Sequence, residues 1–284
     1  MRKFNIEKGL YGKKMVVCDA FTEDMASYCA KNKIAGLELN WAKGFKGDDL
    51  SFLKNLHFLK SFTICDYNIK DISPIHHLEN LRQLDISTYC KTPLDFAAFD
   101  RLEELSLFWR PGIKSLSKCN NLRRLFLYKY NPPTKDLSEI AKLTNLRALS
   151  LKIPTIFSIG DVAAMEKLES LGIYGATKLT DIAGLGKLKN LKELNIDCCK
   201  KINDFDTIMN LQDLEHLSLS NDGPIKSLAP VAKLKKLKDL YFIESTNIKN
   251  GDLSCLKELP GLTKISFQNR KHYNLKREQF NAYN

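Results

Sequence analysis

The sequence predicts an α/β solenoid, a right-handed coil with a parallel sheet on its concave face and short 3₁₀ or α helices on its convex face. The first observation is a phrase that occurs eleven times in the 284 residues, in which three apolar residues are separated by two and then by one variable residue. The second is the distance between copies, which stays between 20 and 25 residues. Such a period is typical of units that bury their apolar faces only against neighbouring units. The copies begin at Ile34, Leu59, Leu81, Leu102, Leu122, Leu146, Leu168, Leu191, Leu214, Leu237 and Leu262.

Each repeat is expected to hold one short strand and one short helix. In residues 69–86, the closing segment 84–86 alternates apolar and polar side chains, which predicts a strand. Apolar residues recur at every third position over residues 72–81, which favours one or two turns of 3₁₀ or α helix. The stretch Asp71-Ile72-Ser73-Pro74 supplies capping side chains and a proline that suits the first helical turn.

The two ends of the chain depart from the repeat. We expect a strand at residues 15–17 and a helix over residues 23–31, capped by Thr22, which together would cover the open core of the first coil. The polar C-terminal residues predict either a final strand and helix or a frayed tail. The expected parts are an N-terminal cap at 1–33, about eleven repeats at 34–268, and a C-terminal cap or tail at 269–284.

These motifs resemble a known family. Residues 142–151, with the sequence KLTNLRALSL, are close to the repeat core of leucine-rich-repeat proteins of the short bacterial type seen in internalins, and residues 71–74 resemble the linker of that family. The resemblance covers about residues 34–267. It implies the fold much more strongly than a function, because members of the family bind many unrelated partners.

One position departs from the family pattern. The family usually places Asn or Cys three residues beyond the last apolar residue of the strand, where the side chain bonds neighbouring backbones. Only Cys199 fits this pattern here, so we expect irregular coils or a different closure of that corner. The eleven positions hold Ala42, Tyr67, Tyr89, Arg110, Tyr130, Pro154, Ala176, Cys199, Asp222, Ser245 and Arg270.

The composition and the N-terminal residues indicate the cellular location of the protein. No apolar stretch approaches the roughly 18 residues that span a bilayer, and no apolar block of signal-peptide length follows the charged N-terminus. We therefore expect no membrane span and a cytoplasmic location, with delivery into a host cell also compatible. The eight cysteines fall at unrelated phases of the repeat and form no CxxC pair, which predicts buried or inert thiols in a reducing compartment.

Catalytic and metal-binding patterns are missing from the sequence. His76 and His77 lie side by side on a helical return, without a carboxylate or cysteine at ligand spacing. There is no GxSxG, no HExxH and no glycine-rich phosphate loop. We therefore expect a protein that is not an enzyme and needs no cofactor or metal.

The residues expected on the concave face indicate where a partner binds. The position between the last two apolar residues of each phrase, and the position after the strand, face that surface. Most hold small polar residues, but repeats four to seven hold aromatic and basic ones, the composition of an interface hot spot. An alternative is that some of these rings fill space under the loop near Pro132, and this packing is favoured for Tyr67, Tyr89 and Tyr130. The predicted partner-binding residues are Phe108, Trp109, Arg110, Phe126, Tyr128, Lys129, Lys152 and Tyr174.

The leading hypothesis is a non-catalytic, monomeric module of a bacterial cytoplasm that binds a protein partner on its concave face. A narrower version is an immunity protein or inhibitor that plugs the active site of a toxin or enzyme. The net charge of +11 raises a second alternative, binding to nucleic acid or an anionic surface, with affinity that falls steeply with salt. Lysine runs at residues 187–192 and 233–238 alternate with core positions, which favours a solvated rim over a nucleic-acid site.

Overall fold

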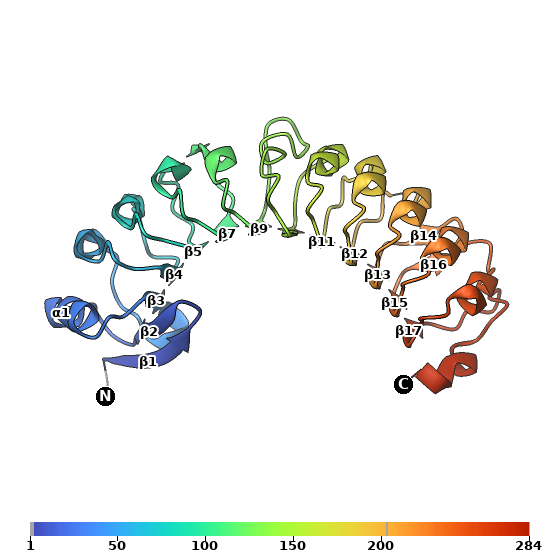
Figure 1. Ribbon diagram of the computed structural model, residues 1–284, viewed down its shortest axis with the longest axis horizontal. Coiled ribbons are helices and arrows are strands. Elements are labelled where there is room, and N and C mark those ends of the chain that lie inside the picture. Colours follow the sequence, from blue (N-terminus) through green and yellow to red (C-terminus); the bar gives the residue numbers. More distant parts are fainter. Residues whose placement is uncertain (1–2, 203, 284) are drawn as a thin grey trace. The chain divides into compact units, whose positions relative to one another are not determined.

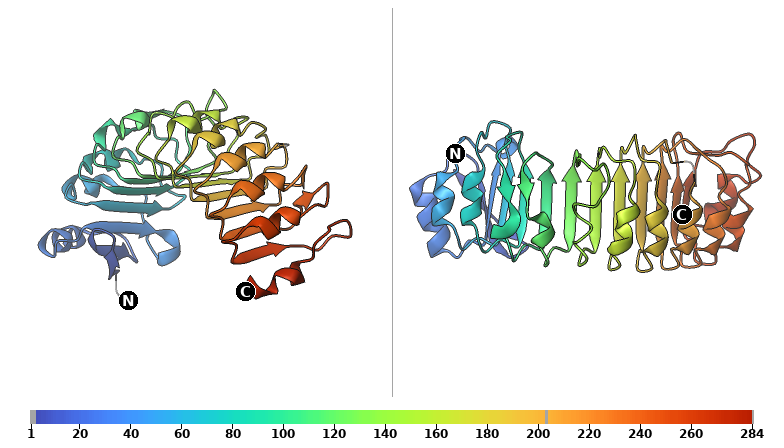
Figure 2. Two further views of the ribbon diagram at one scale, coloured as in Figure 1. Left: turned by 45° about the vertical axis from the view of Figure 1, so that its right-hand side comes forward. Right: turned by 90° about the horizontal axis from the view of Figure 1, so that it is seen from above.

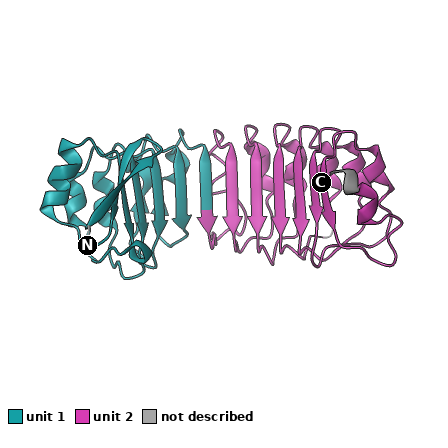
Figure 3. Cartoon of the chain, turned by 90° about the horizontal axis from the view of Figure 1, so that it is seen from below, with its two compact units in different colours: residues 1–126 teal, residues 127–284 magenta. Residues whose placement is uncertain are grey.

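The copies of the repeated phrase end in parallel strands, as expected. The computed structural model describes residues 3–202 and 204–283, and the chain forms two units, unit 1 at Met1–Phe126 and unit 2 at Leu127–Asn284 (Figure 3). In each unit the strands form the concave face and short helices form the convex face (Figure 1). This is the predicted α/β solenoid.

The strands of unit 1 run in the order β1-β2-β3-β4-β5-β7-β9, and the last two residues of β9, Leu127 and Tyr128, belong to unit 2. The middle apolar residues of successive phrases pair in register, as Leu37 with Phe62, Phe62 with Leu84 and Leu84 with Leu105. Because strand side chains alternate between faces, this register stacks every middle apolar residue on the core side. The strands are β1 (Phe4–Gly9), β2 (Gly12–Val17), β3 (Gly36–Asn40), β4 (Ser61–Cys65), β5 (Gln83–Ser87), β7 (Glu104–Phe108) and β9 (Arg124–Tyr128), with a separate parallel pair β6 (Leu94–Asp95) and β8 (Ile113–Lys114).

The sheet of unit 2 runs in the order β10-β11-β12-β13-β15-β17, and it keeps the same register. Leu149 pairs with Leu171, Leu171 with Leu194, and Leu194 with Leu217. The strands are β10 (Ala148–Lys152), β11 (Ser170–Tyr174), β12 (Glu193–Asp197), β13 (His216–Ser220), β15 (Asp239–Phe242) and β17 (Lys264–Phe267), with a separate parallel pair β14 (Pro224–Ile225) and β16 (Asn247–Ile248).

The convex returns are 3₁₀ helices of three to five residues, which lie on the side of the strands opposite the concave face (Figure 2). The third-position pattern of residues 72–81 is explained by burial, since Ile72, Ile75, Leu78 and Leu81 are fully inaccessible to solvent. Each such side chain contributes about 1.5–3 kcal/mol of hydrophobic stabilisation. The helices are η2 (Ser51–Asn55), η3 (Ser73–His77), η4 (Phe96–Ala98), η5 (Leu116–Lys118), η6 (Gly160–Ala164), η7 (Ala183–Lys187), η8 (Asp206–Asn210), η9 (Ala229–Lys233) and η10 (Ser254–Glu258).

The N-terminal elements agree with the sequence prediction and add one strand to it. Helix α1 spans Glu23–Lys31 as expected and buries Met25 and Cys29, although the Thr22 side chain makes no capping hydrogen bond. The expected strand at residues 15–17 is part of β2. Strand β1 pairs with it in antiparallel fashion and was not foreseen, because its side chains are mostly exposed and carry no apolar pattern. Near the other end, the 3₁₀ helix η11 covers Arg277–Tyr283.

The corner after each strand is closed by different side chains in different repeats. Asp222 accepts a hydrogen bond of 2.8 Å from the backbone amide of Cys199. The guanidinium of Arg270 donates to the carbonyl oxygens of Glu244 and Thr246, at 2.9 and 3.0 Å. Repeats are thus tied together at this corner without a uniform Asn, as the departure from the family pattern predicts.

All eight cysteines are free, and four of them are buried. Burial raises the pKa of the Cys29 thiol to about 11 and those of Cys119, Cys199 and Cys255 to about 12. These four thiols are protonated at neutral pH and pack as small apolar side chains.

Candidate partner-binding surface

Four aromatic rings follow one another along the C-terminal ends of the strands of unit 1. The ring centroids of Trp41 and Tyr67 are 6.4 Å apart, those of Tyr67 and Tyr89 are 4.6 Å apart and stacked, and those of Tyr89 and Phe108 are 6.3 Å apart. Trp41 follows β3, Tyr67 follows β4, Tyr89 follows β5, and Phe108 ends β7. We call these four residues the aromatic ridge.

The ridge is exposed, which corrects one expectation from the sequence. The exposed fractions are 54% for Trp41, 42% for Tyr67 and 65% for Tyr89. The packing interpretation is therefore wrong for Tyr67 and Tyr89, whereas it is right for Tyr130, whose side chain is fully buried. Sequence reasoning missed Trp41. The available signal was a large aromatic residue two positions beyond the last apolar residue of a strand, the position that Trp109 also holds.

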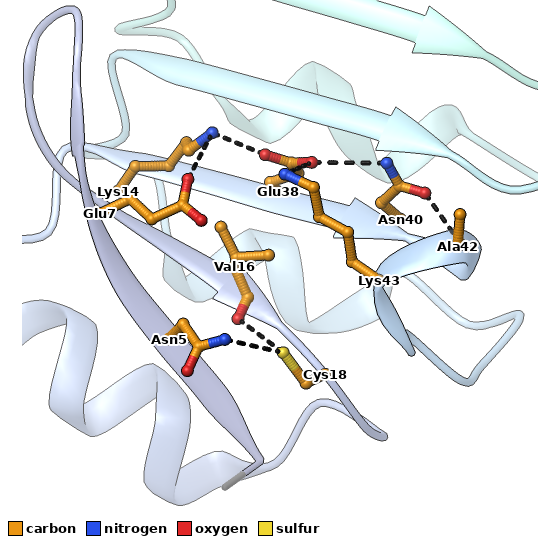
Figure 4. Close-up of polar contacts among 9 residues, drawn as sticks. All are labelled: Asn5, Glu7, Lys14, Val16, Cys18, Glu38, Asn40, Ala42 and Lys43. Atoms are coloured by element: carbon orange, nitrogen blue, oxygen red, sulfur yellow. Dashed lines mark hydrogen bonds and ion pairs between the residues drawn. The ribbon is translucent and has the colours of Figure 1, made fainter.

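An ion-pair network around the buried carboxylate of Glu38 holds the short helix that carries Trp41 (Figure 4). Glu38, in β3, is only 5% exposed, and its carboxylate lies 2.6 Å from Lys14 Nζ and 2.7 Å from Lys43 Nζ. Asn40 Oδ1 accepts a 3.0 Å hydrogen bond from the amide of Ala42 and caps η1 (Trp41–Lys43). Burial alone would raise the pKa of the Glu38 carboxyl, but the two lysines outweigh burial and hold that pKa below its usual value. Both ends of η1 are thereby fixed.

Arg110 is buried, so its expected exposure is wrong. Arg110 is only 4% exposed. Its guanidinium donates a hydrogen bond of 3.0 Å to the carbonyl oxygen of Cys90 and one of 3.2 Å to the hydroxyl of Thr88. These two acceptors flank Tyr89 in the sequence. Arg110 therefore positions the loop that presents Tyr89 rather than offering its charge to a partner. Trp109 and Phe126, two further predicted site residues of unit 1, are half-buried.

The predicted residues of unit 2 are more exposed. Lys129 and Lys152 are exposed, and Lys129 Nζ lies 5.4 Å from the ring centroid of half-buried Tyr128, a cation–π distance. Lys129 has a left-handed backbone, with φ of 55°. Beside Lys152, Ile153 is 46% exposed and also left-handed, with φ of 52°. The strand ends of unit 2 thus present cationic and apolar groups together.

Tyr174 is half-buried because its ring lies against the concave face of its own strand. Gly172 precedes it by two residues in β11, and a methyl group there would lie 2.6 Å from Cε2 of Tyr174. Burial raises the pKa of the Tyr174 hydroxyl, and the carboxylates of Glu193 and Asp197 raise it further. The predicted site residues thus divide between the units: Phe108, Trp109, Arg110 and Phe126 in unit 1, and Tyr128, Lys129, Lys152 and Tyr174 in unit 2.

Several lysines of the two runs on the solvated rim bond to the adjacent repeats. Lys192 Nζ lies 3.2 Å from a carboxylate oxygen of Glu169, and Lys236 Nζ lies 2.6 Å from one of Asp213. Lys235 Nζ donates to the carbonyl oxygen of Glu258 at 3.0 Å. These lysines connect repeats.

His76 serves the repeat geometry. Its Nδ1 lies 2.9 Å from the carbonyl oxygen of Ser73, and its Nε2 accepts 3.1 Å from the amide of Asp95, so both ring nitrogens are engaged. Within residues 3–202 and 204–283, no three His, Cys, Asp or Glu side chains are grouped as metal ligands. Over the same residues, no helix has the length and apolar character to cross a bilayer.

No protein-family model matches this chain. Among solved structures, it resembles an internalin (inlF) from Listeria monocytogenes, with a TM-score of 0.65 over 91% of this chain and 83% of the internalin, at 24% identity. The chain has the leucine-rich-repeat fold. The repeat register of both units and the 3₁₀ returns are the local features of that fold.

Two curated proteins share part of the sequence. A Trypanosoma equiperdum protein whose name links it to adenylate cyclase regulation is 30% identical over 158 residues, 53% of this chain and 23% of that protein. An uncharacterized Caenorhabditis elegans protein is 36% identical over 106 residues, 37% of this chain and 21% of that protein. This chain therefore spans less than a quarter of the length of either relative.

Proposed function

We propose that this leucine-rich-repeat protein is a non-catalytic, monomeric module that binds a protein partner on its concave face. The observation that carries the proposal is the aromatic ridge, in which three large rings are exposed to solvent although each is held in a defined place. Fixed rings bury area with little loss of side-chain entropy, which is why aromatic residues dominate interface hot spots. Strands lie about 4.8 Å apart, so four neighbouring strands give a ridge of roughly 15 Å, the scale of an interface core.

The predicted residues of unit 2 extend this proposal. Tyr128, Lys129, Lys152 and Tyr174 offer aromatic and cationic groups at the strand ends of their own unit. We place the function in a bacterial cytoplasm, with residues 1–33 and 269–284 acting as caps around the repeats at 34–268. An immunity protein or inhibitor that covers the active site of a toxin or enzyme is the narrower form of this function.

Affinity capture tests the proposal. Immobilised protein is incubated with lysate of the source cell, and captured proteins are identified by mass spectrometry. Trp41→Ala and Tyr89→Ala truncate the most exposed rings and are expected to lower capture at least tenfold, whereas Trp109→Ala and Tyr128→Ala test the half-buried rings.

The matched control is Phe157→Ala, which truncates an aromatic side chain that is 50% exposed and lies outside the proposed surface. It is expected to capture the partner as the wild type does, and thermal unfolding checks that all variants are folded. If Trp41→Ala and Tyr89→Ala capture the same proteins in the same amounts as the wild type, the ridge is not the binding surface.

A further inference from the structure

The opposite edge of the unit 1 sheet holds a basic pocket. A cavity of about 610 Å³ opens at the N-terminal ends of β4, β5 and β7. Three lining residues, Lys60, Arg82 and Glu103, directly precede these strands. The remaining lining residues precede the first apolar residue of four successive phrases: Phe58, Asn80, Arg101 and Asn121.

Asparagine side chains hold the walls of the pocket. Asn80 Nδ2 donates a hydrogen bond of 3.0 Å to the carbonyl oxygen of His57, and Asn121 Nδ2 donates one of 2.8 Å to the carbonyl oxygen of Asp100. Each bond joins a repeat to the one before it. The pocket therefore keeps its shape without an occupant, because its walls are part of the repeat structure.

The one carboxylate in the pocket already has partners. Glu103 Oε1 accepts from Nε of Arg82 at 2.9 Å, and Glu103 Oε2 accepts from the hydroxyl of Tyr11 at 3.2 Å. Tyr11 lies in the turn between β1 and β2, and the guanidinium of Arg82 lies 4.7 Å from the centroid of its ring. Both carboxylate oxygens of Glu103 are thus already bonded, one to Arg82 and the other to Tyr11 in the β1–β2 hairpin.

Two cations of the pocket remain without a countercharge. Lys60 and Arg101 are exposed, and among the described residues no carboxylate lies within ion-pairing distance of either. Arg101 Nη1 donates 3.0 Å to the neutral Oδ1 of Asn80. At the equivalent edge of unit 2 the pattern differs, because Lys238 lies 2.5 Å from Glu215 and Lys236 lies 2.6 Å from Asp213. Unit 2 also has a cation of this kind at its edge, because exposed Lys167 precedes Leu168 as Arg101 precedes Leu102 and donates a hydrogen bond of 2.6 Å to the neutral Oδ1 of Asn145. What marks the pocket is that two such cations, Lys60 and Arg101, line one cavity.

We propose that this pocket binds the carboxylate side chains of an acidic segment of the protein partner, an inference that rests on the proposed function. A five-residue strand spans about 16 Å, so a protein seated on the ridge reaches the pocket at the other edge of the same sheet. Arginine and lysine bind carboxylates through charge-assisted hydrogen bonds. Glu103 in the wall disfavours a doubly charged phosphate more than a singly charged carboxylate. The ridge would then anchor the partner, and the pocket would set its orientation.

A labelled peptide tests the pocket without the partner. Binding of fluorescein-labelled hexaglutamate is measured by fluorescence anisotropy at low salt, with hexaglutamine as the uncharged probe. The double variant Lys60→Gln and Arg101→Gln is expected to bind hexaglutamate about tenfold more weakly than the wild type. The control, Lys91→Gln with Lys114→Gln, removes the same charge from exposed lysines of unit 1 outside the pocket and is expected to stay within about twofold.

Equal losses in the two double variants, or wild-type binding of hexaglutamine as tight as that of hexaglutamate, would overturn the proposal. Pyrophosphate is the third probe, and binding of pyrophosphate but not of hexaglutamate through Lys60 and Arg101 would also overturn it. The Trp41→Ala and Tyr89→Ala variants are expected to retain hexaglutamate binding. If partner capture survives in those variants while hexaglutamate binding depends on Lys60 and Arg101, the ridge is not the binding surface and the pocket stands. If the wild type captures no partner while hexaglutamate binding depends on Lys60 and Arg101, the proposed function fails and only the carboxylate-binding pocket stands.

Discussion

The ring of Tyr174 lies directly over Gly172, two residues earlier in β11. A methyl group on Gly172 would approach Cε2 of Tyr174 to 2.6 Å and its hydroxyl oxygen to 2.7 Å, both closer than unbonded atoms come. Glycine at this concave position therefore allows the ring to lie flat on the sheet. The pair explains why a bulky aromatic residue at a strand end is half-buried without entering the core.

Replacing Gly172 by alanine is expected to turn the Tyr174 ring away from the sheet and expose it. The cost to folding is expected to be small, about 1 kcal/mol or less, because the clash falls on the far end of a side chain that is free to swing outward. Nitration by tetranitromethane, followed by peptide mass spectrometry, measures the reactivity of the Tyr174 ring. Faster nitration at Tyr174, with unchanged rates at exposed Tyr89, is the expected result; an unchanged rate at both would contradict the assigned ring position.

Truncating Arg110 is expected to destabilise unit 1. Arg110→Ala leaves the carbonyl oxygen of Cys90 and the hydroxyl of Thr88 without their buried donor, which costs about 2–3 kcal/mol. Arg110→Lys is expected to recover little of this, because an ammonium group cannot reproduce the planar fork that reaches both acceptors. Urea unfolding measures the loss. Arg123→Ala removes an exposed arginine of the same unit and is expected to change the free energy of unfolding by less than about 0.5 kcal/mol.

The burial of the residues at the corner after each strand could not be predicted from the sequence. Tyr89, Arg110 and Tyr130 occupy the same position of three successive repeats, yet Tyr89 is 65% exposed whereas Arg110 and Tyr130 are 4% and 0% exposed. The strands were predictable because each apolar phrase buries its own residues in every repeat. Whether a corner residue is exposed or buried depends on a side chain twenty or more residues away. Arg110, for example, bonds to Thr88 and Cys90, the residues before and after Tyr89. That pairing has no signature in a single sequence.

The same limit applies to the asparagines. The family pattern places Asn or Cys after the strand, and only Cys199 fits that pattern in this chain. Asparagine instead acts before the first apolar residue of the phrase, where Asn80, Asn121 and Asn190 each donate to a carbonyl oxygen of the preceding repeat. The recurrence of Asn-Leu in the sequence is the signal for this row of asparagine hydrogen bonds. A single sequence does not distinguish these asparagines from ordinary exposed surface residues.

Asp222 is expected to make stability depend on pH near neutrality. Its side chain is 1% exposed, burial raises its pKa to about 7, and the hydrogen bond from the Cys199 amide only partly offsets the burial. A raised folded-state pKa favours the protonated form in the native state. The stability from this group is therefore fully present below the unfolded pKa near 4 and is lost as pH rises to about 7, by roughly 4 kcal/mol.

Asp222→Asn is expected to remove this dependence, because the amide keeps an acceptor for Cys199 and carries no charge. The variant should be more stable than the wild type at pH 8 and nearly equal to it at pH 4. Thermal unfolding of both proteins between pH 4 and pH 8 measures the difference. A wild-type curve that runs parallel to that of the variant over this range would show that Asp222 does not titrate in it.

The contribution of Glu38 to folding stability depends on pH in the opposite direction to that of Asp222. Its pKa is held below the usual value by Lys14 and Lys43, so its contribution to stability is present above the unfolded pKa and is lost as pH falls through the folded pKa. At neutral pH, Glu38→Gln is expected to cost about 1–3 kcal/mol, because it removes a buried carboxylate from two ammonium groups. Since Lys43 ends the helix that Trp41 begins, the variant should also change the emission of Trp41, measured in a Trp109→Phe background so that one tryptophan reports.

Glu7→Gln is the matched control for Glu38→Gln. Glu7 also pairs with Lys14, at 3.4 Å, but its side chain is 47% exposed and it makes no contact with η1 (Figure 4). An exposed pair contributes about 0–1 kcal/mol, so the control should lose little stability and leave the emission of Trp41 unchanged. If the two variants behave alike, burial of Glu38 is not what fixes η1, and the ridge must be held by the tilted contact between the rings of Trp41 and Tyr67 instead. A larger effect for Glu38→Gln in both measurements would tie the exposed end of the ridge to one buried carboxylate beneath it.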